Sequence, residues 1–195
     1  MRRAISRTVE QLKTLEVLHV TKAKAMIRSE RMTADLNSDF VVFMIGMRIN
    51  SPLKVHKWLP VIRAMPRMLV ELHRQPELGF IHAEMWFART TIMVQYWRSM
   101  EQLMAYAKLR TAEHLPAWQA FNKSIGTDGS VGIWHETYAA TSGSYENVYV
   151  NMPSFGMGRA GKLHAASGGR KTAIGRLNAA GKDVDDNQQS VASGF

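Results

Sequence analysis

Cysteine is absent from this sequence of 195 residues. Its absence excludes disulfides, thiolate metal ligands and a thiol nucleophile. No apolar run reaches the roughly 18 residues that a membrane-spanning helix needs, and the basic N-terminus lacks the apolar segment of a secretory signal. Gly-rich phosphate loops, nucleophile elbows and Walker motifs are missing too. We therefore expect no membrane span and a cytoplasmic protein.

Acidic residues are few, since 16 Asp and Glu stand against 25 Lys and Arg, which gives a formal net charge of +9. The excess lies at the ends: the net charge is +4 over residues 1–36, +2 over 37–157 and +3 over 158–195. Basic ends can bind an anionic partner, but solvated flanks explain them more simply. A nucleic-acid partner is not expected.

Composition divides the chain into three parts. Residues 1–36 contain helix formers with apolar residues at helical spacing, which predicts an N-terminal helical extension. Residues 37–157 carry the patterns of a folded domain. Residues 158–195 are rich in Gly, Ala and Ser and nearly lack aromatics, so they can bury little apolar area against their ordering entropy. We expect this last part to be a flexible basic tail.

The middle part alternates between two hydrophobic periods. Period-two patterns predict strands and three- or four-residue spacing predicts helices. The resulting order is strand 39–50, helix 55–77, strands 78–89 and 90–98, helix 99–126 and strand 131–140. This β-α-β-β-α-β order is the split βαβ arrangement of an α+β, ferredoxin-like sandwich. Ser99 is the expected N-cap of the second helix.

Both faces of the predicted sheet are apolar. In the first strand Val41, Phe43 and Ile45 share one face with residues 47 and 49, whereas Phe40 and Val42 belong to the other. Two helices cover one face only, so the other face must be covered as well. We expect a homodimer that closes sheet on sheet.

Several motifs occur in order at plausible spacing: "FVVFMIGMRINSPLKVHKWLPVIRAMPRMLVEL", "GFIHAEMWFARTTIMVQYWRS", "HLPAWQAFN", "GIWHETY" and "VYVNMPSFGMG". Over about residues 37–157 the chain resembles a bacterial and fungal family that is grouped with the fumagillin-type polyketide monooxygenase. The resemblance implies a dimeric α/β barrel near the antibiotic-biosynthesis monooxygenases. Haem-containing aldoxime dehydratases and chlorite dismutases share that architecture. One departure is His82, where the family pattern favours a small residue.

The strand "VGIWHETY" carries the first candidate site. Alternation places Ile133, His135 and Thr137 on one side and Trp134 and Glu136 on the other. We expect His135 to face the cavity between sheet and helices, as a general base or a haem ligand. Glu136 is expected on the dimer side, so the two cannot form a dyad within one chain.

A second polar line lies in "FIHAEMWF", where alternation places Phe80, His82, Glu84 and Trp86 on one face. His82 and Glu84 are two residues apart and can form a hydrogen bond. Two such ligands do not complete a zinc site, and we expect no metal.

Three functions from different classes are compatible with these patterns. The first is a monooxygenase of secondary metabolism that acts on a hydrophobic aromatic or polyketide-like molecule without a cofactor, with His135, Tyr96 and Asn151 as catalytic residues. Five further side chains would bind its substrate: Trp134, Trp86, Trp97, His82 and Trp118. The second is a haem enzyme, with an axial ligand among His135, His82 and His114. The third is a non-catalytic dimer that binds a small molecule or a partner.

Overall fold

The computed structural model of the protein describes residues 26–36, 38–109 and 128–180. Its main sheet has four antiparallel strands, β2 (Phe40–Ile49), β3 (Phe80–Trp86), β4 (Ile92–Trp97) and β5 (Val131–Ala140). The helices α2 (Val55–Arg74) and α3 (Met100–Lys108) connect them, with a single 3-10 turn, η1 (Pro76–Leu78), before β3.

The strand order across the sheet is β3-β4-β2-β5. This is the ferredoxin-like order, and it confirms the predicted α+β architecture. The predicted hairpin is present as β3 and β4, which pair antiparallel. Ser99 caps α3 as expected, because its side chain accepts a hydrogen bond from the backbone N–H of Gln102. The rest of the second predicted helix, from residue 110, lies outside the described residues.

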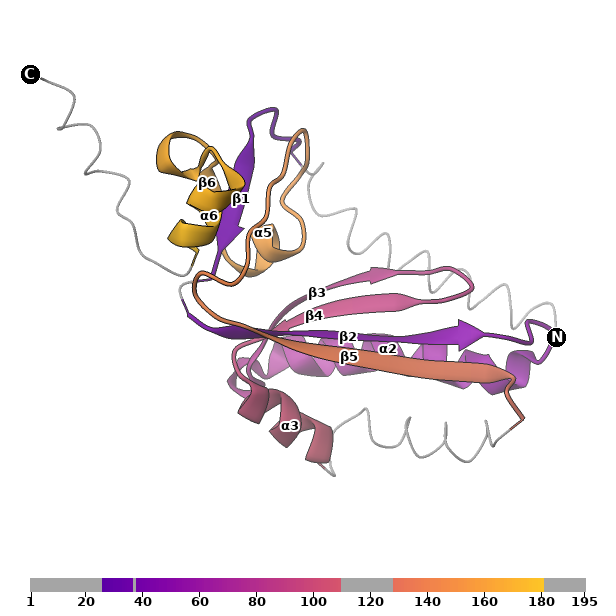
Figure 1. The fold of residues 1–195 in the computed structure, drawn as a ribbon. Coiled ribbons are helices and arrows are strands. Elements are labelled where there is room, and N and C mark those ends of the chain that lie inside the picture. Colours follow the sequence, from indigo (N-terminus) through magenta and orange to yellow (C-terminus); the bar gives the residue numbers. More distant parts are fainter. Residues whose placement is uncertain (1–25, 37, 110–127, 181–195) are drawn as a thin grey trace, which may run out of the picture.

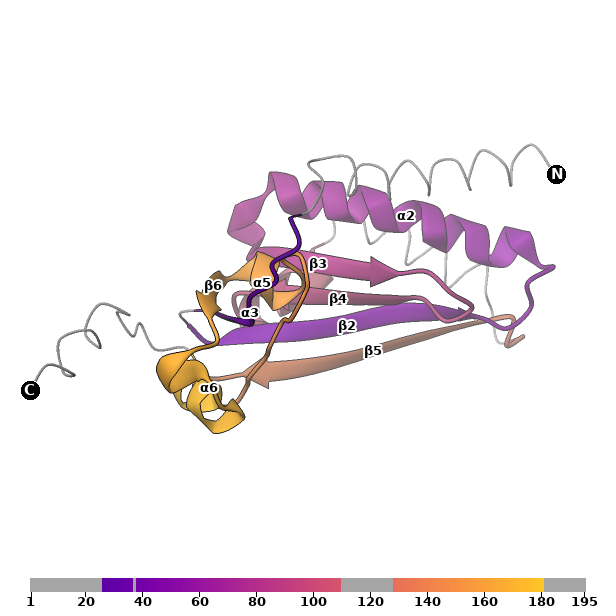
Figure 2. The same ribbon diagram turned by 90° about the horizontal axis from the view of Figure 1, so that it is seen from above.

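The helices lie on one face of the sheet, which we call the inner face (Figures 1 and 2). Alternation in β2 and β4 directs one set of side chains to this face, where they meet the apolar side of α2 and α3. The cluster is built around fully buried residues: Val41, Leu72, Phe80, Ala83, Met93, Trp97, Leu103 and Tyr106. Pro60 and Pro66 both lie within α2, which continues through them as one helix.

A second, smaller unit covers one end of the opposite, outer face. Its strands β1 (Met32–Asp35) and β6 (Lys162–Ala165) form a two-stranded antiparallel sheet, accompanied by α5 (Met157–Ala160), the 3-10 turn η2 (Gly168–Arg170) and α6 (Ala173–Ala179). Ala34 and Met157 of this unit pack with Phe40 of the main sheet. The unit lies beside the end of β2 where that strand begins (Figure 1). The chain itself therefore hides part of the face that we expected a dimer to cover.

The expected flexible tail from residue 158 is wrong for residues 158–180. These residues form β6, η2 and α6, because β6 finds in β1 a partner for its backbone hydrogen bonds. The unit also contains a buried ion pair between Asp35 and Arg170. The described part of the N-terminal extension, residues 26–36, contains the strand β1 and no helix. Residues 1–25 and 181–195, which carried the helical and low-complexity patterns, lie outside the described residues.

An irregularity in β3 corrects one expected face. The register against β4 shifts between Phe80 and His82, so Phe80 belongs to the buried inner cluster while His82 and Glu84 belong to the outer face. A β-bulge adds one residue to a strand and breaks strict alternation. The grouping of Phe80 with His82 on one face is therefore wrong, whereas the grouping of His82 with Glu84 holds. Among the helices within the described ranges, none is both long and apolar enough for a membrane span.

Candidate functional site

A pocket of about 400 Å³ opens between the inner face of the sheet and the two helices. Its walls come from all four strands of the main sheet, from α2 and α3, and from the segment between β3 and β4. The lining is mostly apolar and contains five methionines: Met47, Met65, Met68, Met85 and Met104. Unbranched thioether side chains adapt their shape to a ligand, and a concave apolar cavity of this size suits a small molecule.

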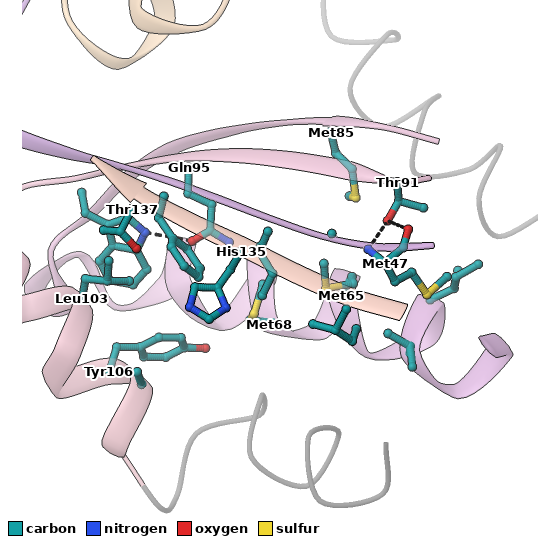
Figure 3. A pocket seen from close by; sticks show the side chains of 18 of the residues that line it. Met47, Met65, Met68, Met85, Thr91, Gln95, Leu103, Tyr106, His135 and Thr137 are labelled. Carbon is teal, nitrogen blue, oxygen red and sulfur yellow. Dashed lines mark hydrogen bonds between the residues drawn. The ribbon is translucent and has the colours of Figure 1, made fainter. Parts of the chain in front are cut away.

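His135 faces this pocket (Figure 3), as expected, and alternation in β5 turns Glu136 to the other side. Its ring packs at a tilt against the ring of Phe43, with 5.9 Å between their centroids. Ile45 is its partner in the neighbouring strand. Within the described residues, no side chain or backbone group is hydrogen bonded to the imidazole. Among the described residues, both ring nitrogens of His135 are therefore available to a ligand.

Gln95 is a second polar group on the pocket wall, and it was not among the residues predicted for the site. It is 2% exposed, and its carboxamide lies between two neighbours of the same strand face. The indole Nε1 of Trp97 donates to its Oε1 at 2.8 Å, and its own Nε2 donates to the Met93 sulfur at 3.0 Å. The available signal was the pattern Met93, Gln95, Trp97, in which one amide interrupts a buried face.

Two further polar residues of the pocket, Thr91 and Tyr106, form hydrogen bonds within the fold. The Thr91 hydroxyl accepts a hydrogen bond from the backbone N–H of Met47 at 3.0 Å and donates one to the backbone carbonyl oxygen of Met47 at 3.3 Å. The Tyr106 hydroxyl donates to the Glu71 carboxylate at 2.8 Å. Thr137 shares the strand face of His135 and lines the same wall. The groups best placed to act on a ligand are thus His135 and Gln95.

The structure separates the predicted site residues between the two faces of the sheet. Trp97 is buried at the pocket with His135. Four of the others belong to the outer face, away from the pocket: Tyr96, His82, Trp86 and Trp134. The sheet itself divides them from His135, because neighbours along a strand point to opposite sides. Their predicted roles beside His135 do not agree with this arrangement.

Asn151 is also absent from the pocket wall. It is exposed, in a segment after β5, with a backbone φ of 54°. Asn tolerates this left-handed conformation better than most residues do, so the backbone explains its presence there. Trp118 and His114 lie outside the described residues.

The outer face holds its own polar cluster, which centres on the Glu84 carboxylate. Its Oε1 accepts hydrogen bonds from His82 Nε2 and from the backbone N–H of Gly156, both at 3.1 Å. Arg159 lies 3.6 Å from the same oxygen. Burial alone would raise the pKa of Glu84, but these hydrogen bonds and the charges of His82 and Arg159 outweigh it and lower the pKa. The predicted His82–Glu84 contact is confirmed. The Glu84 carboxylate also binds the loop at Gly156 to the sheet.

Tyr96 neighbours this cluster and is a poor proton carrier. Burial, followed by the nearby Tyr149 and Glu84, raises the pKa of Tyr96 to about 12. Its hydroxyl therefore stays protonated at neutral pH and cannot serve as a base there.

The described residues fit metal or haem poorly. In the ranges 26–36, 38–109 and 128–180, no three His, Asp or Glu side chains gather as metal ligands. His135 could supply an axial bond to haem iron, whereas His82 is held by Glu84 on the other face. The described lining of the pocket includes no Lys or Arg that could pair with haem propionates. This lining suits a neutral apolar molecule.

The sequence of the domain that holds this pocket matches a known protein family. The model of the family described as "Monooxygenase af470-like" matches residues 40–157. Monooxygenase af470 of Aspergillus fumigatus is 29% identical over 130 residues, which are 61% of this chain and 45% of that protein. The chain thus spans about half the length of this curated relative.

One solved structure supports the fold, and a second shows a weaker similarity. An aldoxime dehydratase, OxdRE in complex with butyraldoxime, has a TM-score of 0.56 at 14% identity and covers 72% of this chain and 42% of its own. SnoaB, a cofactor-independent oxygenase from Streptomyces nogalater, has a TM-score of 0.39 at 15% identity, over 52% of this chain and 93% of its own.

Proposed function

Because the chain belongs to the monooxygenase af470-like family, we propose that it is a monooxygenase whose active site is the pocket on the inner face. The observation that carries this proposal is His135, an imidazole without a hydrogen-bond partner among the described residues, in a wall that is mostly apolar. A base in such a place can remove a weakly acidic proton from a bound molecule. Water is displaced by an apolar ligand, which strengthens electrostatic interactions in the pocket.

The reaction that we propose uses the substrate as its own reductant. His135 takes a proton from a CH₂ group that is acidified by a conjugated carbonyl, which leaves a carbanion delocalised onto the carbonyl oxygen. The carbanion transfers an electron to O₂, and the resulting pair combines to form a C–O bond. Protonation by His135 gives the hydroperoxide, CH–OOH, which loses water to become C=O. One oxygen atom enters the product and the other leaves as water, so no external reductant is needed.

The substrate class follows from the wall of the pocket. The described lining has aromatic and thioether side chains and no cation, so we propose a neutral aromatic or polyketide-like molecule. Phe43 offers a ring beside His135 on which a planar substrate can stack. A role in secondary metabolism and a cytoplasmic location are further parts of the proposal and rest on the family resemblance.

We propose in addition that the protein is a homodimer through the outer face. The unit around β1 and β6 covers only one end of that face, and large side chains beyond it stay exposed. Tyr138 is 53% exposed and Trp86 is 44% exposed. Exposed aromatic side chains on a sheet face are typical of an interface between subunits.

The test is oxygen uptake with anthrone, a probe whose central CH₂ is acidified by a carbonyl and two aromatic rings. We expect the wild-type protein to accelerate its oxidation to anthraquinone, and His135→Ala to lose at least about 100-fold of that rate, which is the usual contribution of a general base. His56→Ala is the matched control, since His56 is exposed on α2 outside the pocket. Equal rates for His135→Ala and the wild type would overturn the proposed role.

The haem alternative predicts a different result. Added hemin would then give a Soret band that His135→Ala changes. A stable haem complex of this kind, without anthrone oxidation, would favour the haem enzyme over the proposed oxygenase.

A further inference from the structure

We propose that Gln95 donates a hydrogen bond to the oxygen atom of the bound substrate on which negative charge develops. This role of Gln95 rests on the proposed function, because Gln95 would act on the same substrate as His135 in the same pocket. The supporting observation is that a fully buried amide lies on the wall of a largely apolar cavity. Burying a polar group without adequate hydrogen-bond partners costs free energy, so a buried amide at a cavity indicates a structural or functional role.

The orientation of the Gln95 amide follows from its neighbour. The Trp97 indole N–H can only donate, so the atom of Gln95 that faces it at 2.8 Å is the oxygen. The NH₂ group must then point the other way, towards the Met93 sulfur at 3.0 Å. This removes the usual ambiguity between the nitrogen and oxygen atoms of a glutamine side chain.

The NH₂ group is left with donor capacity. A thioether is a weak acceptor, and an amide NH₂ has two hydrogens to donate. In the described part of the chain, the Met93 sulfur is the acceptor found for this group. Gln95 is thus a donor held in place before a ligand arrives, which is the property of groups that stabilise an oxyanion.

The strand register places this donor on the same wall of the pocket as His135, two strands away. Phe43 of β2 is paired with Gln95 on one side and with Thr137 on the other. His135 lies two residues before Thr137 on the same strand face (Figure 3). Two strand spacings separate the backbones of Gln95 and Thr137, about 10 Å. A flat ring over Phe43 can therefore meet the imidazole at one side and the amide at the other.

The test compares two variants that differ in the amide alone. Trp97→Phe keeps Gln95, and the double variant Gln95→Met with Trp97→Phe replaces the amide by an isosteric thioether and leaves no indole N–H unpaired. The probe is 4-nitro-1-naphthol, whose anion absorbs visible light. We expect the pKa of the bound probe to be higher by about one unit or more in the double variant, a tenfold weaker preference for the anion. Equal values in the two variants would overturn the assignment.

A measurement on the wild-type protein covers the case in which the double variant does not fold. The side-chain amide protons of Gln95 should shift downfield in NMR spectra when the naphtholate binds, and unchanged shifts would contradict the inference. Neither readout needs turnover. If the probe binds through Gln95 but anthrone is not oxidised, the proposed oxygenase activity is rejected and the role of Gln95 as a hydrogen-bond donor stands. If anthrone is oxidised but neither readout changes at Gln95, the activity stands and the role of Gln95 is rejected.

Discussion

At the scale of single residues, Glu84 shows how a buried carboxylate attaches a loop to the sheet. Replacing Glu84 with Gln removes the ionic contact with Arg159 and disturbs the hydrogen bonds to His82 and Gly156. The side chain is 12% exposed, so we expect a loss of about 1–3 kcal/mol in the free energy of unfolding at neutral pH. Urea denaturation of the wild-type protein and the variant measures this difference.

The pH dependence of that difference follows from the lowered pKa of Glu84, which is held down against the effect of burial by His82, Gly156 and Arg159. A carboxyl group with a lower pKa in the folded state stabilises the protein above its ordinary pKa of 4.5. The contribution is lost as the pH falls below that value through the folded pKa. The wild type and Glu84→Gln should therefore converge in stability at acidic pH. A constant difference from pH 7 to pH 3 would contradict this explanation.

Residue-scale prediction from the sequence succeeded where alternation is regular. That His135 and Glu136 lie on opposite sides of β5 followed from period two alone, since β5 pairs with β2 over ten consecutive residues without a shift. The role of Gln95 could not be predicted from the sequence, because it depends on a hydrogen bond from the Trp97 N–H that residue spacing does not specify. The chemistry of Tyr96 suits a catalytic role, but its one-residue spacing from Gln95 and Trp97 puts it on the other face of β4.

At the scale of elements, Gly46 is needed for the close packing of β2. A Cβ atom there would lie 1.9 Å from the backbone oxygen of Thr91 and 2.7 Å from the Trp134 Nε1. Backbone cannot give way as a flexible side chain can, so we expect Gly46→Ala to lower the free energy of unfolding by about 1–3 kcal/mol. Thermal denaturation followed by circular dichroism measures the effect.

Gly132 provides the matched control in the paired strand β5. A Cβ atom there would meet its nearest neighbours, Arg48 Cβ and Asn50 Nδ2, at 3.8 and 3.9 Å. Gly132→Ala should be neutral or slightly stabilising, because alanine restricts the unfolded chain more than glycine does. Equal destabilisation by the two substitutions would show that the contact with Thr91 is not the cause.

The elements of the main sheet were predictable because each has a local signal, such as period two or an N-cap serine. The bulge in β3 was not, since the shift between Phe80 and His82 depends on how β3 pairs with β4. The unit of β1 and β6 was missed for a similar reason. Its strands are four residues long and lie far apart in the sequence, so neither shows a pattern until the other pairs with it.

At the scale of the whole molecule, the exposed part of the outer face predicts a dimer. Tyr138→Lys places a charge in the proposed interface and removes the 2.5 Å hydrogen bond to Glu136. We expect the dissociation constant to rise at least about tenfold, which corresponds to 1.4 kcal/mol. Size-exclusion chromatography with light scattering over a range of concentrations measures it.

Leu53→Lys serves as the control for this change. Leu53 is 91% exposed and belongs to the connection between β2 and α2, not to a strand of the proposed interface, so its substitution should leave the dimer intact. Glu136→Gln should weaken the dimer with activity retained, because Glu136 faces away from the pocket. A wild-type protein that is monomeric at micromolar concentration would contradict the proposed interface.

In the proposed reaction, the substrate itself reduces O₂ in the pocket of His135. Oxidation of anthrone under ¹⁸O₂, with no added metal, flavin or reductant, tests it most directly by mass spectrometry of the anthraquinone. We predict one ¹⁸O atom per product molecule, formed at the rate of oxygen uptake and strongly reduced in His135→Ala. An unlabelled product, or labelling that proceeds equally well without His135, would contradict the account.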